Sequence, residues 1–186
     1  MSQNSPQKWF QLEEHFFKGV DQDLLKKLRG DLEKAETAEQ IMQVAGIQNA
    51  ELAREIADLN VTVETLAAFR LAPVVVVAWA DDRVENNERY HITKAAEKSG
   101  IDSDDPAMEL LKSWTERRPP SDLMDAWCQY AAALTSSLAE AHRSSLKEEM
   151  VGLVKAVAEA NGGLLGFASV SPSESEVLKQ VEEALS

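Results

Sequence analysis

An uncharged run of ten residues, Leu71–Ala80, constrains the fold of this chain more than any other feature. It contains four consecutive valines and ends at the acidic residue Asp81. A membrane span needs about 20 apolar residues, so we expect this shorter run to lie in the core of a soluble protein. The valines also fit a strand, but Pro73 cannot donate a hydrogen bond to a sheet. The Ala-rich flank Thr65–Ala68 therefore favours a buried helix over 63–80 that is kinked at Pro73.

The rest of the 186-residue chain has the composition and the spacing of helices. Only eight glycines and six prolines interrupt it, and its apolar residues recur at helical spacing. No two strand-like segments are joined by a hairpin turn. We therefore predict an all-α fold, a compact bundle of about eight or nine helices with the 63–80 segment buried at its centre. Capping residues predict helix starts at Ser5, Thr37, Asn49, Thr62, Asn86, Asp105, Ser121 and Ser171.

Two regions are expected along the chain. Residues 1–61 are predicted to form an N-terminal helical extension that packs on the core, and residues 62–186 to form the main helical domain. The extension begins with an aromatic stripe, Trp9–Phe17, which we expect to pack on the bundle, with docking on a partner as the alternative. A second apolar stripe is predicted at Leu24, Leu25, Leu28 and Leu32.

The net charge of −13 narrows the classes of partner. Nucleic-acid phosphates and anionic membranes repel a chain this acidic, so we expect it to bind neither nucleic acid nor an anionic membrane surface. The longest apolar run is too short to span a bilayer, so we expect no membrane insertion. A protein partner or a cation fits better. One cysteine excludes an internal disulfide, and no secretion signal is visible, so we expect a cytoplasmic protein. The pair Arg117–Arg118 is too small a basic patch to bind nucleic acid.

The densest group of oxygen ligands in the chain directly follows the uncharged run. Asp81, Asp82, Glu85 and Glu88 place four carboxylates within eight residues. Hard cations such as calcium or magnesium bind several oxygens at once, so these four residues are candidate ligands for a divalent cation. The same residues also suit the start of a helix, where acids interact favourably with the helix dipole and Asn86 can act as the cap. The sequence leaves both interpretations open.

The acidic segment has a loose copy later in the chain, which predicts an internal two-fold repeat. Val77–Glu88 and Val157–Glu174 each contain an Ala-rich helix, a small or acidic turn, and Val-x-x-x-Glu before a new helix. The first copy resembles the signature of the TerB-like (tellurite-resistance) family, an apolar helix followed by Asp-Gly-x-aliphatic-x-x-x-Glu. Asp82 replaces the family's glycine here, so the turn is expected to be less comfortable if it needs a positive φ angle.

The resemblance covers about Thr62–Leu185 and implies a compact helical bundle in a stress- or tellurite-resistance system. A metal-binding role has been proposed for the acidic loops of that family. We expect a non-enzymatic helical interaction module of such a system, with a divalent cation at the acidic loop as an added hypothesis. The alternative is a metal-dependent enzyme on a helical bundle. The residues favour the module, because Glu88 and His91 form a single Glu-x-x-His pair where a di-iron centre needs two, and Cys128 is expected in the core.

Overall fold

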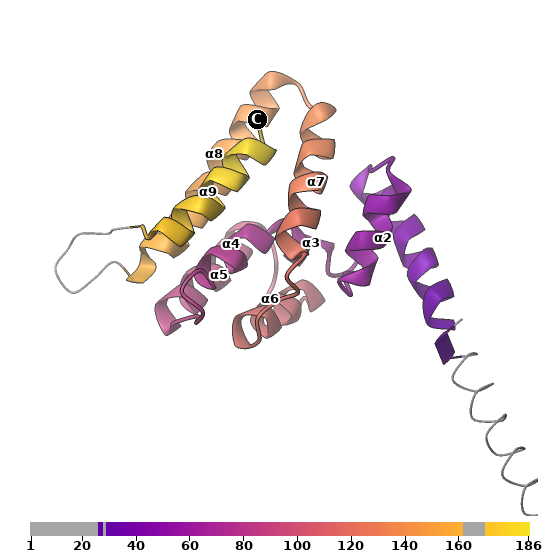
Figure 1. The fold of residues 1–186 in the computed structure, drawn as a ribbon, viewed down its shortest axis with the longest axis horizontal. Coiled ribbons are helices and arrows are strands. Elements are labelled where there is room, and N and C mark those ends of the chain that lie inside the picture. The colour runs from indigo at the N-terminus through magenta and orange to yellow at the C-terminus, as the bar shows by residue number, and fades with distance from the viewer. Residues whose placement is uncertain (1–25, 28, 162–169) are drawn as a thin grey trace, which may run out of the picture.

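The computed structural model describes residues 26–27, 29–161 and 170–186, and these residues are helical with no strand (Figure 1). The all-α prediction is therefore confirmed. The predicted helix start at Ser5 and the aromatic stripe Trp9–Phe17 lie outside the described residues. The nine described α-helices are 29–45, α2 (Ala50–Asp58), α3 (Leu66–Arg70), α4 (Ala72–Ala78), α5 (Asn86–Lys98), α6 (Pro106–Glu116), α7 (Leu123–Ser136), α8 (Glu140–Ala158) and α9 (Pro172–Ala184), with a 3₁₀ turn η1 (Glu159–Asn161) after α8.

The uncharged run forms two short helices, α3 and α4, where the sequence predicts one kinked helix. Leu71 separates them, since it ends α3 and begins α4 with φ −95° and ψ 11°. Pro73 lies in the first turn of α4, where its missing N–H has no helical partner to lose. The predicted kink is thus a complete break. Thr62 does not cap the helix, because its own backbone N–H donates to Thr65 Oγ1 at 2.9 Å in a turn before α3.

Helix α4 lies among the helices α3 and α5–α9, and it contacts each of them. The side chains of Val74, Val75 and Val77 are at most 1% exposed, whereas Val76 is only partly buried. Fully burying one valine contributes about 1.5–3 kcal/mol. The α4 helix therefore anchors both the turn that follows it and the helices that pack around it.

The N-terminal part of the described chain packs on α7 through α2. Ile41, Leu52 and Ile56 are fully buried and belong to the same hydrophobic cluster as the valines of α4. Asn49 caps α2 as predicted, since its Oδ1 accepts a hydrogen bond from the Glu51 backbone N–H at 3.0 Å. The described part of residues 1–61 is therefore joined to the core, while the domain boundary at residue 61 stays a prediction.

Two predictions for this part of the chain are wrong. Thr37 does not start a helix, because the helix 29–45 runs through it and its hydroxyl donates to the Glu33 carbonyl at 2.8 Å. A threonine bonded in this way is tolerated inside a helix. Leu32 belongs to the predicted apolar stripe but is 70% exposed, whereas Ala38 and Ile41, nearer the core along the same helix, are buried. The other three leucines of the stripe lie outside the described residues.

Helices α7 and α8 are joined by a short turn at 137–139 and both pack on α4 and α9. Helix α7 begins at Leu123, with Asp122 as its N-cap in place of the predicted Ser121. The chain end follows α9, and Leu185 is only 2% exposed there. Among the described helices, none combines the length and the apolar character that a membrane crossing requires.

Candidate functional site

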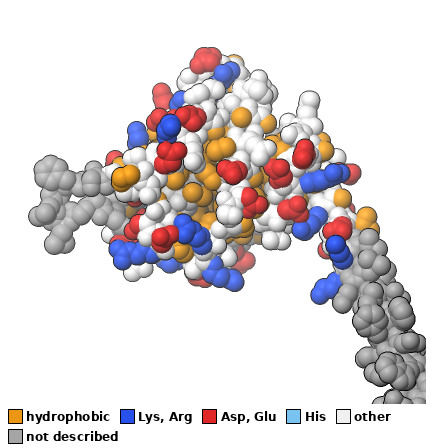
Figure 2. Space-filling view, viewed as in Figure 1, with side chains coloured by type: hydrophobic (Ala, Val, Ile, Leu, Met, Phe, Trp, Pro, Cys, Tyr) orange, Lys and Arg blue, Asp and Glu red, His pale blue; other side chains and the backbone are white. Residues whose placement is uncertain are grey.

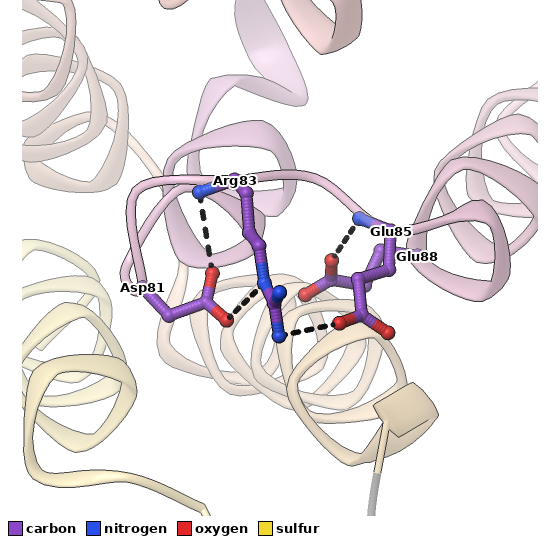
Figure 3. A network of polar contacts seen from close by, with 4 residues as sticks. All are labelled: Asp81, Arg83, Glu85 and Glu88. Atoms are coloured by element: carbon purple, nitrogen blue, oxygen red, sulfur yellow. Dashed lines mark hydrogen bonds and ion pairs between the residues drawn. The ribbon is translucent and has the colours of Figure 1, made fainter.

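The acidic turn, residues 81–88, follows α4 and includes the first residues of α5; Figure 3 shows four of its side chains. Asp82 has φ +69°, so the turn does need the left-handed conformation at the position of the family's glycine. A side chain in that conformation costs roughly 1 kcal/mol relative to glycine, and aspartate is among the residues that tolerate it best. Asp82 therefore carries local backbone strain, which is the outcome expected from the sequence.

Arg83 holds two of the four carboxylates. Its Nη2 lies 2.9 Å from Glu85 Oε1, and its Nε lies 3.6 Å from Asp81 Oδ2. Figure 3 shows the guanidinium between the two acids, and the Arg83 backbone N–H also donates to Asp81 Oδ1 at 3.4 Å. Arg83 and Asp81 are exposed and Glu85 is half-buried, so each ion pair contributes at most about 1 kcal/mol.

Asp82 is paired with Arg118, which lies just after α6. Arg118 Nη1 is 2.5 Å from Asp82 Oδ1, and Nη2 donates to the Trp79 carbonyl at 3.3 Å. The guanidinium also lies 5.9 Å from the ring centroid of Trp79, whose Nε1–H donates to the Trp114 carbonyl at 2.7 Å. Arg118, one of the two arginines that look isolated in the sequence, is thus a partner of the acidic turn although it lies far from the turn along the chain.

Glu88 is buried in the first turn of α5, with 3% of its surface exposed. Its Oε2 accepts a hydrogen bond from the Glu85 backbone N–H at 2.7 Å (Figure 3). Glu85 is the N-cap of α5, a role that the sequence assigns to Asn86. The start of α9 repeats this arrangement, because Glu174 Oε2 accepts from the Ser171 backbone N–H at 2.6 Å. Both bonds belong to the capping box, while the two-fold repeat as a whole stays a prediction.

The four predicted cation ligands do not converge on one point. Asp81 and Glu85 face Arg83, Asp82 faces Arg118, and Glu88 accepts from the backbone. Within the part of the chain that the structure describes, no three His, Cys, Asp or Glu side chains lie close enough together to hold a metal ion. The four carboxylates are thus paired with groups of the chain itself, and the calcium or magnesium site stays a prediction.

A second candidate region, which the sequence motifs do not mark, is a hollow between α7 and α8. We call it the α7–α8 groove. It has a volume of about 300 Å³, at the lower end of the range for ligand sites. Its lining is apolar except for Arg70 and the hydroxyl of Tyr130: Ala45, Arg70, Trp127, Tyr130, Ala131, Leu134, Leu146, Met150 and Leu185.

Two further hollows share lining residues with the groove and extend it. One, of about 440 Å³, is lined by the loop 45–49 and the end of α7, and it shares Tyr130 and Leu134 with the groove. The other, of about 170 Å³, reaches Leu153 on α8 and shares Leu146 with the groove. Figure 2 shows apolar side chains gathered in the middle of one face of the molecule, the face on which α7 lies in Figure 1.

Arg70 is held against α7 by its backbone and by its side chain. Its carbonyl accepts from Trp127 Nε1–H at 3.0 Å, and its own Nε–H donates to the Tyr130 hydroxyl at 3.2 Å. The ring of Tyr130 meets Phe69 edge-on, with 5.6 Å between the centroids. Tyr130 is 4% exposed, whereas Arg70 is exposed. A fixed aromatic residue thus positions an exposed guanidinium at an apolar hollow.

Cys128 lies beside Trp127 on α7 and is partly buried. Burial raises the pKa of its thiol, and the charges of Asp125 and Glu183 raise it further. A thiol of raised pKa is a poor nucleophile at neutral pH. This agrees with the prediction that Cys128 is a packing residue.

The chain matches no protein-family model, and comparison with curated proteins and with solved structures finds no similar protein. The resemblance to TerB-like domains therefore rests on the sequence pattern at residues 77–88 and its loose copy at residues 157–174.

Proposed function

We propose that this protein is a helical interaction module that docks a helix of a protein partner in the α7–α8 groove. The observation that carries the proposal is the pair of apolar stripes that face the groove. Trp127, Ala131 and Leu134 recur along α7 at helical spacing, and Leu146 and Met150 do so along α8. Two flanking helices with a hollow between their apolar faces are the usual receptor for a third amphipathic helix.

The exposure of the lining residues supports docking over simple core packing. Trp127, Tyr130 and Met150 are buried and form a fixed floor, whereas Leu134 and Leu146 at the rim are only partly buried. A preformed apolar floor lowers the ordering cost of binding, because the side chains that contact the partner are already held in place. Docking would remove the remaining exposed apolar area of the rim from water.

The cellular context is proposed from the sequence. The TerB-like resemblance suggests a stress-associated or tellurite-resistance-like system. Neither the docking proposal nor that context requires a cation at the acidic turn. The protein partner is expected to bind through the groove, and the acidic turn is expected to act as a helix start that holds α4 and α5 in place.

Site-specific photo-cross-linking tests the proposal. A photoreactive phenylalanine analogue is placed at Leu134 in the groove and, as a matched control, at Tyr90, which is 59% exposed on α5 and does not line the groove. The partner that cross-links from position 134 is identified, purified and titrated against the full chain. We expect Leu134→Asp to weaken that binding by about 100-fold, because the charge would enter an apolar contact.

Two controls make the result decisive. Tyr90→Asp should leave the affinity unchanged, and both variants should melt within a few degrees of the wild type because neither position is fully buried. Cross-linking from position 90 but not from position 134 would place the interface elsewhere and overturn the proposal. An unchanged affinity of folded Leu134→Asp would do the same.

A further inference from the structure

We propose that the docked helix carries one acidic side chain on its apolar face, and that Arg70 pairs with this side chain and sets the register of docking. The inference rests on the proposed function and names the chemistry of the partner. It assigns Arg70 the role of a specificity-determining residue at the groove.

The lining of the groove carries few charges. Arg70 and Glu149 are the only charged residues that line the groove and its two extensions, as far as the described chain shows. Arg70 lies where the groove meets the extension toward Leu153, and it lines both. No carboxylate forms an ion pair with Arg70 among the described residues, although the whole chain carries 32 acidic residues. The guanidinium is therefore available to a ligand.

Covering the guanidinium of Arg70 with a docked helix costs free energy. A helix laid in the groove would remove water from Arg70, and a buried charge without a partner is strongly unfavourable. The hydroxyl of Tyr130 accepts only from Nε, at 3.2 Å, and no partner of the two terminal nitrogens is seen among the described residues. Those nitrogens form a planar fork that matches a carboxylate in a two-bond pair. An Asp or Glu on the docked helix would satisfy both.

The rest of the charge distribution limits where acids are acceptable. Glu149 lines the extension toward Leu153, so an acid on the helix near that end would face a like charge. The net charge of −13 also repels acidic partners at long range. The helix that fits best is therefore neutral or basic on its outer face, with a single acid among its apolar residues. A lysine or arginine opposite Glu149 would add a second pair.

A displayed peptide library tests this inference even before the natural partner is identified. The probe is an 18-residue amphipathic helix with a basic outer face, in which each apolar-face position is varied among Leu, Gln, Lys and Glu. The full chain is the bait, and binders lost on Leu134→Asp are kept as groove-dependent. We expect glutamate to be enriched at one apolar-face position and depleted at the others.

A double-mutant cycle then assigns the contact to Arg70. In an enriched peptide, Glu→Gln should weaken binding to the wild-type chain by about 10-fold or more, but should have little effect on Arg70→Gln. The charge exchange Arg70→Glu with Glu→Lys in the peptide should restore part of the lost affinity. Arg70 is exposed, so its variants are expected to fold, and a melting curve for each one checks this.

The outcomes separate this inference from the proposed function. Groove-dependent peptides without a glutamate preference, or with one that Arg70→Gln does not remove, would overturn the role of Arg70 and leave the docking proposal standing. A library that yields no groove-dependent peptide would overturn both. Enrichment of glutamate that disappears with Arg70→Gln supports the pair.

Discussion

The acidic turn at residues 81–88 and the α7–α8 groove differ in how their interactions are satisfied. In the turn, each carboxylate already has a partner within the chain: Arg83 for Asp81 and Glu85, Arg118 for Asp82, and a backbone N–H for Glu88. In the groove, apolar side chains and the guanidinium of Arg70 face a hollow of about 300 Å³. The turn is closed by its own contacts, and the groove is open to a ligand.

A cluster of charged residues is a weak guide to function when other groups of the same fold pair with them. Acids at the start of a helix have a structural use, because they satisfy backbone N–H groups and interact with the helix dipole. An apolar hollow has no such internal use, since filling it would stabilise the protein. Unfilled apolar surface is therefore the stronger indication of a binding site.

The largest expected effect concerns α4, which supports both regions. Val77→Asp should destabilise the protein by at least about 3 kcal/mol, because an unpaired carboxylate would enter the core. Val76→Asp, one residue earlier and only partly buried, is the matched control and should cost much less. Urea unfolding of both variants measures the difference. Similar losses for the two would mean that burial along α4 is not what holds the turn and the groove in place.

A smaller effect tests whether the acidic turn is a helix start. Glu88→Ala should cost about 1–2 kcal/mol of unfolding free energy, because the Glu85 N–H loses its acceptor in a buried setting. Glu174→Ala removes the equivalent bond of α9, where the side chain is only partly buried, and should cost less. If Glu88→Ala leaves stability unchanged, the hydrogen bond from the Glu85 N–H to Glu88 does not stabilise the start of α5.

Local signals predict much of this fold. Asn49, Asp105 and Ser171 cap their helices as expected, because a cap depends on residues within one turn of it. Thr37 and Asn86 carry similar signals but do not cap. Thr37 lies inside a longer helix, and Glu85 takes the position before Asn86. A capping residue shows where a helix can start, and tertiary packing decides whether it does.

The groove could not be predicted from the sequence. Its lining combines residues as distant as Ala45, Arg70 and Leu185, which no local pattern relates. The stripe of Trp127 and Leu134 is visible in the sequence, but it looks the same whether it faces the core or a hollow. Asp82 and Arg118, which form an ion pair, lie 36 residues apart in the chain, so no local pattern predicts their pairing either.

A third prediction concerns the strain at Asp82. Asp82→Gly should be more stable than Asp82→Ala by about 1 kcal/mol, because only glycine adopts φ +69° without cost. Both variants lose the exposed ion pair with Arg118, so the comparison isolates the backbone conformation. Thermal unfolding of the two measures the difference. Equal stabilities would show that the turn relaxes when the carboxylate is removed.

The smallest expected effect is that of divalent cations. We expect millimolar calcium or magnesium, compared with chelator, to shift the melting temperature of the wild type and of Asp81→Asn/Glu88→Gln by the same small amount. General screening of the −13 charge acts on both proteins alike. The internal partners of the acids explain the expectation, since a cation would have to displace Arg83 from Asp81 and Glu85.

The size of a specific effect is easy to distinguish from screening. A cation present at 100 times its Kd would add about 2.7 kcal/mol to the free energy of unfolding. This would shift the melting temperature of a chain this size by about 5–10 °C. Arg83→Ala sharpens the test, because it frees two carboxylates and leaves the capping bond of Glu88 in place. A shift of the wild type that Asp81→Asn/Glu88→Gln does not show would mean that the turn rearranges around a cation. A shift that appears only in Arg83→Ala would show that Arg83 occupies the place a cation would take, and that the turn is closed by its own arginine.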